Sequence, residues 1–280
     1  MCRLFGMISN QKVAAEYPLL EASGSLWRLS RINRKEIQKD GWGVGWFEEG
    51  RPYIQKSPKP IYRNEDLLKK AINRAKGHAL IGHIRWASNP LKLPKDRLIG
   101  VNHSQPFAYE QWLFAHNGTL LIPKEVRAHL GSLEEHIQGN NDSEVLFYWL
   151  MKHLRQPLAR GGAAGIVSSI RRSLKGIHEI WDECRKRYPL YKYPYHGLNW
   201  VLTNGKILVA MCYVNPGGFG KSKALGQRKD PYYQLRYRQD SEGWTVASEP
   251  LDEDPRWKSF SHGQVLIANA KSGRFWSLKE

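Results

Sequence analysis

One stretch of the chain alternates between bulky apolar residues and glycine. Residues 40–47 read Asp-Gly-Trp-Gly-Val-Gly-Trp-Phe, so Trp42, Val44 and Trp46 fall on every second position. A period of two predicts a β-strand, because successive side chains of a strand point to opposite faces. One face of this strand would be heavily aromatic and the other bare. Bare glycines let another backbone or a ligand approach closely, so we expect close packing on that face.

The rest of the chain predicts further strands and helices that occur in blocks. Strands are expected at 2–9, 52–55, 78–84, 112–115, 199–203, 206–213, 232–238, 244–248, 264–268 and 274–278. We expect a broken helix over 13–31, a helix over 65–76 with Asn64 as its N-cap, and helices from Asp142 and from Gly162. Asn117-Gly118 is a strong turn signal and is expected to end the strand that begins at Trp112. Such blocks indicate an α+β architecture, and we treat residues 1–280 as a single domain.

The composition indicates a globular, cytosolic protein. Hydrophobic residues make up 41% of the chain, which includes 11 Trp, so a full core can be buried. There is neither an apolar run of the roughly 20 residues that a membrane helix needs nor a signal peptide at the N-terminus. The formal charge of +17 raises a nucleic acid as a partner. Because these charges are spread along the chain, we do not favour a nucleic-acid partner, and the lack of a long apolar run argues against a membrane.

Metal and phosphate sites are not expected either. The three cysteines Cys2, Cys184 and Cys212 have no paired spacing, which excludes a disulfide framework and a zinc site. Residues 215–222 end like a phosphate-binding loop, but the motif's first glycine is replaced by Asn215. No convincing helix follows, so we interpret this stretch as a flexible basic loop. We therefore predict no cofactor and no metal.

Cys2 is the candidate nucleophile. Its small side chain predicts that Met1 is removed, which leaves Cys2 with both a thiol and a free α-amine. That amine has a reference pKa of about 7.7–8.0, so it can take the proton of its own thiol near neutral pH. A cysteine at position 2 is weak evidence alone, and its importance depends on what the rest of the chain provides.

Several short motifs follow Cys2 in a fixed order. They are Asp40-Gly-Trp-Gly, His83-x-Arg85-Trp-Ala-Ser, Asn102-His103-x-Gln-Pro-Phe, His116-Asn-Gly, Asn141-Asp-Ser-Glu144 and Ala247-Ser-Glu-Pro-Leu251. Together they resemble the class II glutamine amidotransferases, and the resemblance covers nearly the whole chain. It is closest to stand-alone members that consist of the glutaminase domain only. It implies an N-terminal-nucleophile hydrolase with a four-layer αββα sandwich of two mainly antiparallel sheets.

The resemblance also implies how a γ-glutamyl amide would be bound. A guanidinium binds a carboxylate bidentately, so Arg85 fits the substrate's α-carboxylate, with Ser88 as a hydroxyl partner. The carboxylate of Asp142 would pair with the α-ammonium group. Trp86 is carried over as a further substrate-binding residue.

The catalytic residues implied by the family are Cys2, Asn117 and Gly118. The Cys2 thiolate would attack the amide, ammonia would leave, and water would hydrolyse the γ-glutamyl thioester. The side-chain amide of Asn117 and the backbone N–H of Gly118 would bind the oxyanion of the tetrahedral intermediate. Glycine at 118 lets the backbone turn its N–H toward the substrate without a Cβ in the way.

One position departs from the family pattern. Several relatives have Arg-Trp-Ala-Thr-His where this chain has Arg85-Trp-Ala-Ser-Asn89. Ser88 can replace the threonine hydroxyl, but Asn89 cannot become cationic, which leaves its part in binding or loop closure open. We interpret His103 and His116 as hydrogen-bonded framework residues, because the α-amine already supplies a base.

Three hypotheses about the function remain open. The chain hydrolyses glutamine, with ammonia either released or passed to a separate synthase subunit. Alternatively, it cleaves a larger γ-glutamyl amide, as in relatives of thiol-histidine biosynthesis, which would require a wider pocket. A reading of another class is a catalytically retired basic module that binds nucleic acid or an acidic protein, with a salt-dependent affinity.

Overall fold

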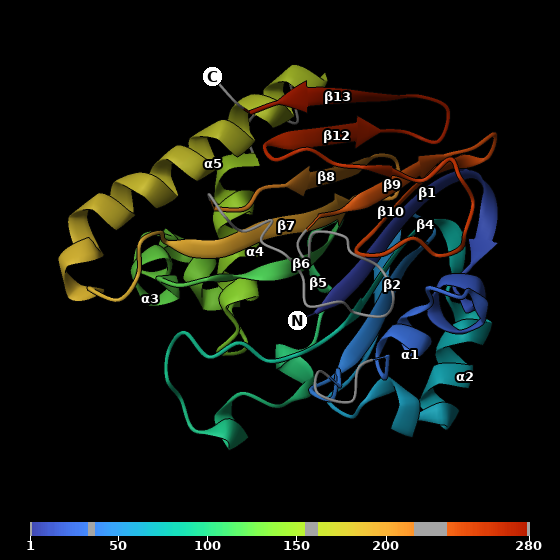
Figure 1. The fold of residues 1–280 in the computed structure, drawn as a ribbon, viewed down its shortest axis with the longest axis horizontal. Coiled ribbons are helices and arrows are strands. Elements are labelled where there is room, and N and C mark those ends of the chain that lie inside the picture. Colours follow the sequence, from blue (N-terminus) through green and yellow to red (C-terminus); the bar gives the residue numbers. More distant parts are fainter. Residues whose placement is uncertain (1, 33–36, 155–161, 216–233, 279–280) are drawn as a thin grey trace.

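Two antiparallel β-sheets stack face to face, and helices cover their outer faces (Figure 1). The computed structural model describes residues 2–32, 37–154, 162–215 and 234–278. The predicted strand 232–238 and the loop 215–222 therefore lie partly outside the described residues. In the described part of the chain, the helices are all too short or too polar to cross a membrane.

The first sheet has seven strands in the order β11-β9-β10-β1-β4-β2-β3. Their bounds are β1 Arg3–Ala14, β2 Trp42–Glu48, β3 Arg51–Ser57, β4 Lys76–Ile84, β9 Arg236–Gln239, β10 Gly243–Ala247 and β11 Lys258–Ser259. Because β1 pairs with β10 on one side and β4 on the other, the N-terminal strand lies in the middle of the sheet. The residue before it, Cys2, is thus placed at the end of a central strand.

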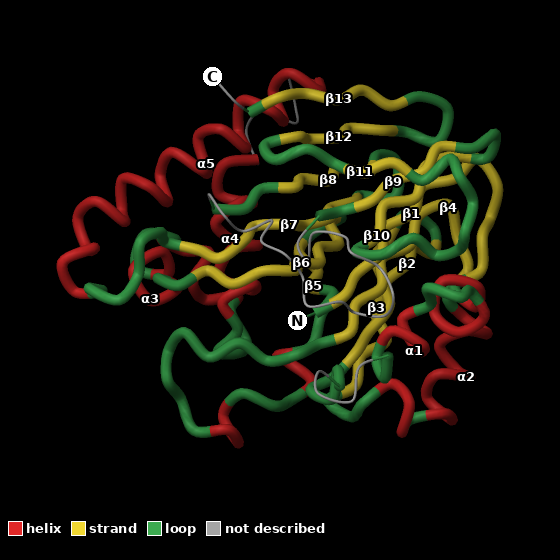
Figure 2. The backbone as a smooth tube through the Cα atoms, in the orientation of Figure 1, coloured by secondary structure: helices red, strands yellow, loops and turns green. Residues whose placement is uncertain are grey.

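The second sheet has six strands in the order β13-β12-β8-β7-β6-β5. Their bounds are β5 Phe107–Tyr109, β6 Trp112–Leu120, β7 Tyr195–Thr203, β8 Leu208–Cys212, β12 Gln264–Ala268 and β13 Gly273–Ser277. The helices are α1 Leu26–Leu29, α2 Glu65–Arg74, α3 Pro123–Arg127, α4 Asp142–Leu154 and α5 Gly162–Cys184. Helices α1 and α2 lie beside the first sheet, and α4 and α5 lie beside the second (Figure 2).

Three apolar layers hold this stack together, as expected for a four-layer αββα sandwich. Phe5, Val44 and Leu80 pack under α1 and α2 on the outer face of the first sheet. Leu4 and Ile81 point the other way and meet residues of the second sheet in the layer between the sheets. The third layer joins the outer face of the second sheet to α4 and α5. The α+β sandwich predicted from the sequence is confirmed.

The glycine-rich strand β2 behaves as its alternation predicts. Trp42 and Trp46 are buried on the helix-covered face of the first sheet. The glycine face receives the second sheet, because a Cβ on Gly45 would lie 2.9 Å from a methyl carbon of Leu113. A Cβ on Gly43 would lie 2.4 Å from the backbone oxygen of Gln105. The glycines therefore let the two sheets come close at this point.

Strand β6 corrects one prediction that matters for the site. Asn117-Gly118 does not form a turn, because β6 continues to Leu120 and pairs Asn117 with Asn199 of β7. The turn preference of Asn-Gly is local, and the long pairing with β7 outweighs it. Gly118 is needed for a different reason, since a Cβ there would lie 1.9 Å from the carbonyl oxygen of Gly197.

Two further predictions near the N-terminus need correction. The expected helix over 13–31 is partly strand, because β1 extends to Ala14 before a π-helix at Tyr17–Glu21 and the short α1. Helix α2 begins after Asn64 as predicted, but the Asn64 amide donates to Ser57 Oγ at 2.6 Å instead of capping the helix. The start of α4 at Asp142 is as predicted.

The close contact at Gly43 yields a stability prediction. Gly43→Ala should destabilise the fold by about 1–3 kcal/mol, because the added methyl collides with backbone rather than with a movable side chain. Chemical denaturation followed by tryptophan fluorescence measures the change. The matched control is Gly77→Ala in β4, where the nearest atom would be 3.4 Å away, an ordinary contact. Equal stability of the two variants would contradict the close-packing argument.

Candidate active site

The Cys2 thiol lies against the backbone of Trp86. Its Sγ accepts a hydrogen bond from Trp86 N at 3.3 Å and donates to Trp86 O at 3.4 Å. Burial raises the pKa of the thiol, and the chain's amino terminus, the Trp86 N–H and Arg85 oppose this only in part. The thiol is therefore protonated at neutral pH, so a reaction through its sulfur needs a base.

Residues far along the chain fix the strand that follows Cys2. Arg3 is buried, donates to Cys2 O at 3.0 Å and pairs with Glu249 at 3.4 Å. Leu4 is held on both sides of its peptide, because Leu4 N donates to Ser248 Oγ at 3.1 Å and Ser248 N donates to Leu4 O at 2.9 Å. Ser248 therefore holds the backbone of β1 at Leu4, and Glu249 holds the side chain of Arg3.

Arg85 places a buried cation next to Cys2. Its backbone N donates to Gly41 O at 2.8 Å, which continues the pairing of β4 beyond its last residue. Its Nη1 donates to Leu98 O at 2.8 Å and to Asp40 O at 3.5 Å. Burial lowers the pKa of the guanidinium, while Cys2 and Asp142 raise it. An arginine stays charged in such a site, so Arg85 keeps a positive charge with 4% of its surface exposed.

Asp142 supplies the opposite charge at the first turn of α4. Its Oδ1 accepts from Ser88 Oγ at 2.8 Å, and its Oδ2 accepts from Leu120 N at 2.9 Å. The residue is 3% exposed. Each carboxylate oxygen can accept two hydrogen bonds, so each retains an acceptor position that no other described residue fills. Ser88 is thus engaged with Asp142 and orients its carboxylate.

Asn117 reaches the Cys2 side of the molecule through Ser248. Its Nδ2 lies 3.4 Å from Ser248 Oγ, the same atom that accepts from Leu4 N. Asn117 is buried, and its Oδ1 has no hydrogen-bond partner among the described residues. The Ser248 hydroxyl therefore contacts both Asn117, the candidate oxyanion donor, and the strand that follows Cys2.

The Gly118 N–H points away from β7. His116 N, two residues earlier, donates to Gln105 Oε1 at 2.7 Å on the side opposite β7. Backbone N–H groups of a strand alternate in direction, so Gly118 N points to the same side as His116 N. Leu120 N, two residues later, donates to Asp142 Oδ2, which indicates that this side faces Asp142.

His103 and His116 are both hydrogen-bonded within the protein, as expected. His116 Nδ1 pairs with Ser143 Oγ at 2.9 Å and its Nε2 with Gly197 O at 3.1 Å, and burial lowers its pKa. His103 Nδ1 accepts from Asn140 N at 3.2 Å. Asn89, left open by the sequence, bonds within its own loop to both the N–H and the carbonyl of Leu93 at 2.8 Å.

The sequence did not identify every residue that shapes this site. Asp40 was part of a motif, but it was assigned no role from the sequence. In the structure its Oδ2 accepts a hydrogen bond from Ala87 N at 2.9 Å and so holds the loop after Arg85. Arg3, Ser248 and Glu249 were also assigned no role from the sequence. The stretch 247–251 was recognised as a family motif, and that was the signal by which Ser248 and Glu249 could have been found.

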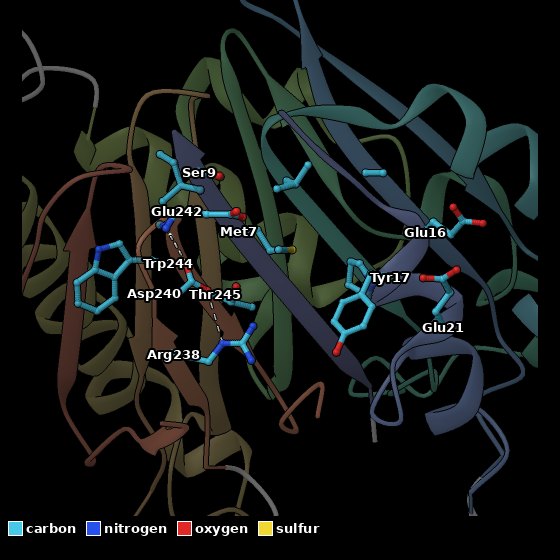
Figure 3. A pocket seen from close by; sticks show the side chains of 15 residues that line it. Met7, Ser9, Glu16, Tyr17, Glu21, Arg238, Asp240, Glu242, Trp244 and Thr245 are labelled. Carbon is cyan, nitrogen blue, oxygen red and sulfur yellow. Dashed lines mark hydrogen bonds and ion pairs between the residues drawn. The ribbon is translucent and has the colours of Figure 1, made fainter. Parts of the chain in front are cut away.

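A pocket of about 320 Å³ lies elsewhere (Figure 3). It surrounds the later part of β1 near Ser9 and contains the ion pair between Arg238 and Asp240 at 3.7 Å. None of the predicted site residues lines it. In the described part of the chain, His, Cys, Asp and Glu form no group suited to a metal ion.

Comparison with known proteins places this geometry in a family. The model of the class II glutamine amidotransferases matches residues 1–277. An uncharacterized protein of Methanocaldococcus jannaschii is 26% identical over 288 residues, which cover 95% of this chain and 69% of that protein. The γ-glutamyl-hercynylcysteine sulfoxide hydrolase of Mycobacterium tuberculosis is 30% identical over 268 residues, covering 92% and 88%.

A solved structure agrees with the fold. The class II glutamine aminotransferase domain protein of Silicibacter pomeroyi superposes with a TM-score of 0.63 at 18% identity, over 100% of both chains. Since the family model spans nearly all residues and the sandwich is the same, the chain belongs to the class II glutamine amidotransferases.

Proposed function

We propose that the chain hydrolyses a γ-glutamyl amide with Cys2, freed of Met1, as its nucleophile. The observation that carries the proposal is the setting of the thiol. A buried cation, Arg85, and a buried anion, Asp142, are both close enough to affect its pKa. A γ-glutamyl group ends in one carboxylate and one ammonium, which is the complementary pair of charges. We further propose that residues 1–280 work as a single domain.

Recognition of the γ-glutamyl head follows from the two charges. Among the described residues, both side-chain hydrogen bonds of Arg85 come from Nη1, so Nη2 and Nε are left to bind the α-carboxylate. Asp142 accepts the α-ammonium with its remaining acceptor positions, while Ser88 holds the carboxylate in place. Trp86 contributes its peptide, which positions the thiol at the end of the substrate's side chain.

The reaction then proceeds in two halves. The α-amine of Cys2 takes the thiol proton, and the sulfur attacks the γ-carbonyl carbon. The resulting oxyanion accepts hydrogen bonds from the Asn117 amide and the Gly118 N–H. The leaving amine takes the proton back from the α-ammonium, which leaves a γ-glutamyl thioester. Water, deprotonated by the same amine, attacks the thioester and releases glutamate with the sulfur again a thiol.

Hydrolysis without a synthase subunit is the reading we favour. The relative with 30% identity is a hydrolase, and this chain covers 88% of its length. Its substrate is a γ-glutamyl compound larger than glutamine, so a larger amide is the second candidate. Release of ammonia from glutamine, compared with release of 4-nitroaniline from γ-glutamyl-4-nitroanilide, separates the two. Turnover of neither, together with salt-dependent nucleic-acid binding, would instead support the retired binding module.

Removal of the thiol tests the nucleophile. Cys2→Ala should reduce turnover to the uncatalysed rate without lowering the melting temperature, because the sulfur forms the covalent bond to substrate. Cys184→Ala is the matched control, since it removes a thiol from α5 that is buried away from the site, and it should stay active. Intact mass should show that Met1 is absent from the active protein. An active protein that retains Met1 would falsify the α-amine mechanism.

The role of Asp142 predicts a loss that depends on the substrate. Asp142→Asn should lower kcat/KM for a γ-glutamyl amide by about 10–100-fold, because a charge-assisted hydrogen bond contributes about 1.5–3 kcal/mol. The corresponding glutaryl amide lacks the α-ammonium, so the variant should change its kcat/KM by less than about threefold. Equal losses for both amides would mean that the carboxylate only supports Leu120 and Ser88.

The identity of the general base determines how kcat/KM depends on pH. Below about pH 7.7–8.0, the reference pKa of an α-amine, kcat/KM should fall about tenfold per pH unit as the amine becomes protonated. Burial lowers the pKa of both His103 and His116 below the usual value of 6.5. A histidine base would therefore place the inflection below pH 6.5. Initial rates between pH 5 and pH 9 distinguish the two bases.

A further inference from the structure

We propose that Ser248 is a positioning residue that orients the Asn117 amide toward the oxyanion. This inference rests on the proposed function, because it assigns Ser248 a task only if Asn117 binds the oxyanion. Ser248 follows β10 directly and is 8% exposed. It is placed between the strand of the nucleophile and the strand of the oxyanion donor, through Leu4 on β1 and Asn117 on β6.

The strand pairing explains why these side chains meet. Leu4 faces the layer between the two sheets, and Ser248 extends the register in which Phe5 pairs with Ala247, so it lies opposite Leu4. On β6, Leu113 and Ala115 face the same layer, so Asn117, two residues on, faces it too. The apolar layer thus ends in polar groups at the end of the sandwich that carries Cys2.

The hydrogen bonds around the Asn117 amide are left incomplete. Ser248 Oγ accepts from Leu4 N at 3.1 Å and from Asn117 Nδ2 at 3.4 Å. Both contacts use the oxygen as acceptor, so the hydroxyl hydrogen is left for a third atom. Meanwhile Asn117 Oδ1 is buried with no partner among the described residues. A buried acceptor without a donor is costly, and here a hydroxyl donor lies beside the same amide.

Half a turn of the amide gives both the Ser248 hydroxyl and Asn117 Oδ1 a hydrogen-bond partner, and leaves the Nδ2 group as the one without a partner among the described residues. Such a rotation exchanges Oδ1 and Nδ2 at almost the same two places. The Ser248 hydroxyl then donates to Asn117 Oδ1 while it still accepts from Leu4 N. The Nδ2 group takes the buried place that Oδ1 leaves, where its hydrogens have no partner among the described residues, and we propose that the oxyanion is their acceptor. Because Leu4 is two residues from Cys2, the same serine ties the donor to the nucleophile.

A double-mutant cycle tests this inference. The variants are Ser248→Ala, Asn117→Ala and both together, each assayed for kcat and KM and for its melting temperature. Asn117→Ala should reduce kcat about a hundred- to a thousandfold, as the loss of one oxyanion donor does. Ser248→Ala should reduce kcat about tenfold and leave KM unchanged, because it removes the hydrogen bond that holds the amide in its donor orientation. The double variant should match Asn117→Ala within about threefold, because the backbone bond from Ser248 N to Leu4 O still holds the start of β1 in both variants.

Two further variants separate positioning from simple loss of a buried serine. Ser169→Ala in α5 is the control, since Ser169 is fully buried, donates to Gly165 O and accepts from Arg172, yet lies outside the site. It should lower the melting temperature but not kcat. Ser248→Cys keeps the size of the side chain with a weaker donor, and should reduce kcat in the same direction even if Ser248→Ala does not fold.

The outcomes are distinct. A double variant that loses about a further tenfold relative to Asn117→Ala would overturn the inference, because Ser248 would then act independently of the amide. So would full kcat in a folded Ser248→Ala or Ser248→Cys protein. Full activity of Asn117→Ala would overturn the proposed oxyanion role itself, and this inference with it.

Discussion

The pairing of Leu4 with Ser248 is the contact on which the geometry of the site depends. Two hydrogen bonds join them, at 2.9 and 3.1 Å, across 244 residues of sequence. Cys2, the proposed nucleophile, lies just before β1, and the residues that follow it set its position. The central place of β1, together with Arg3 bound to Cys2 O and Glu249, holds Cys2 in place.

The charges around Cys2 are also interdependent. Arg85 and Asp142 are both nearly fully buried, in a protein whose formal charge is +17. Each charge lowers the cost of burying the other, and loss of one leaves its partner without compensation. His83 lies in the same part of β4, and burial with nearby Arg85 lowers its pKa to about 3. It therefore stays neutral and adds no positive charge that would repel the guanidinium.

The local sequence pattern predicted the strands and helices well, but it predicted the contacts between distant residues poorly. The alternation in β2 identified both the strand and its close-packed glycine face, and the apolar periodicity after Asp142 identified α4. Asn117-Gly118 misled because a turn preference acts over a few residues, whereas pairing with β7 acts along the whole strand. Ser248 received no role from the sequence, since hydrogen bonds between distant residues leave no local periodicity.

The position of Asn117-Gly118 inside a strand gives the site a property that a turn would lack. On β6 the Asn117 side chain faces the layer between the sheets, while the Gly118 N–H points along the sheet toward the side of Asp142. Two donors of adjacent residues thus leave the chain in different directions. In the proposed oxyanion site, the paired strand fixes the backbone of both residues and Ser248 orients the Asn117 amide, so little reorganisation is needed when the oxyanion forms. A flexible turn would have to be ordered at that moment, at a cost in rate.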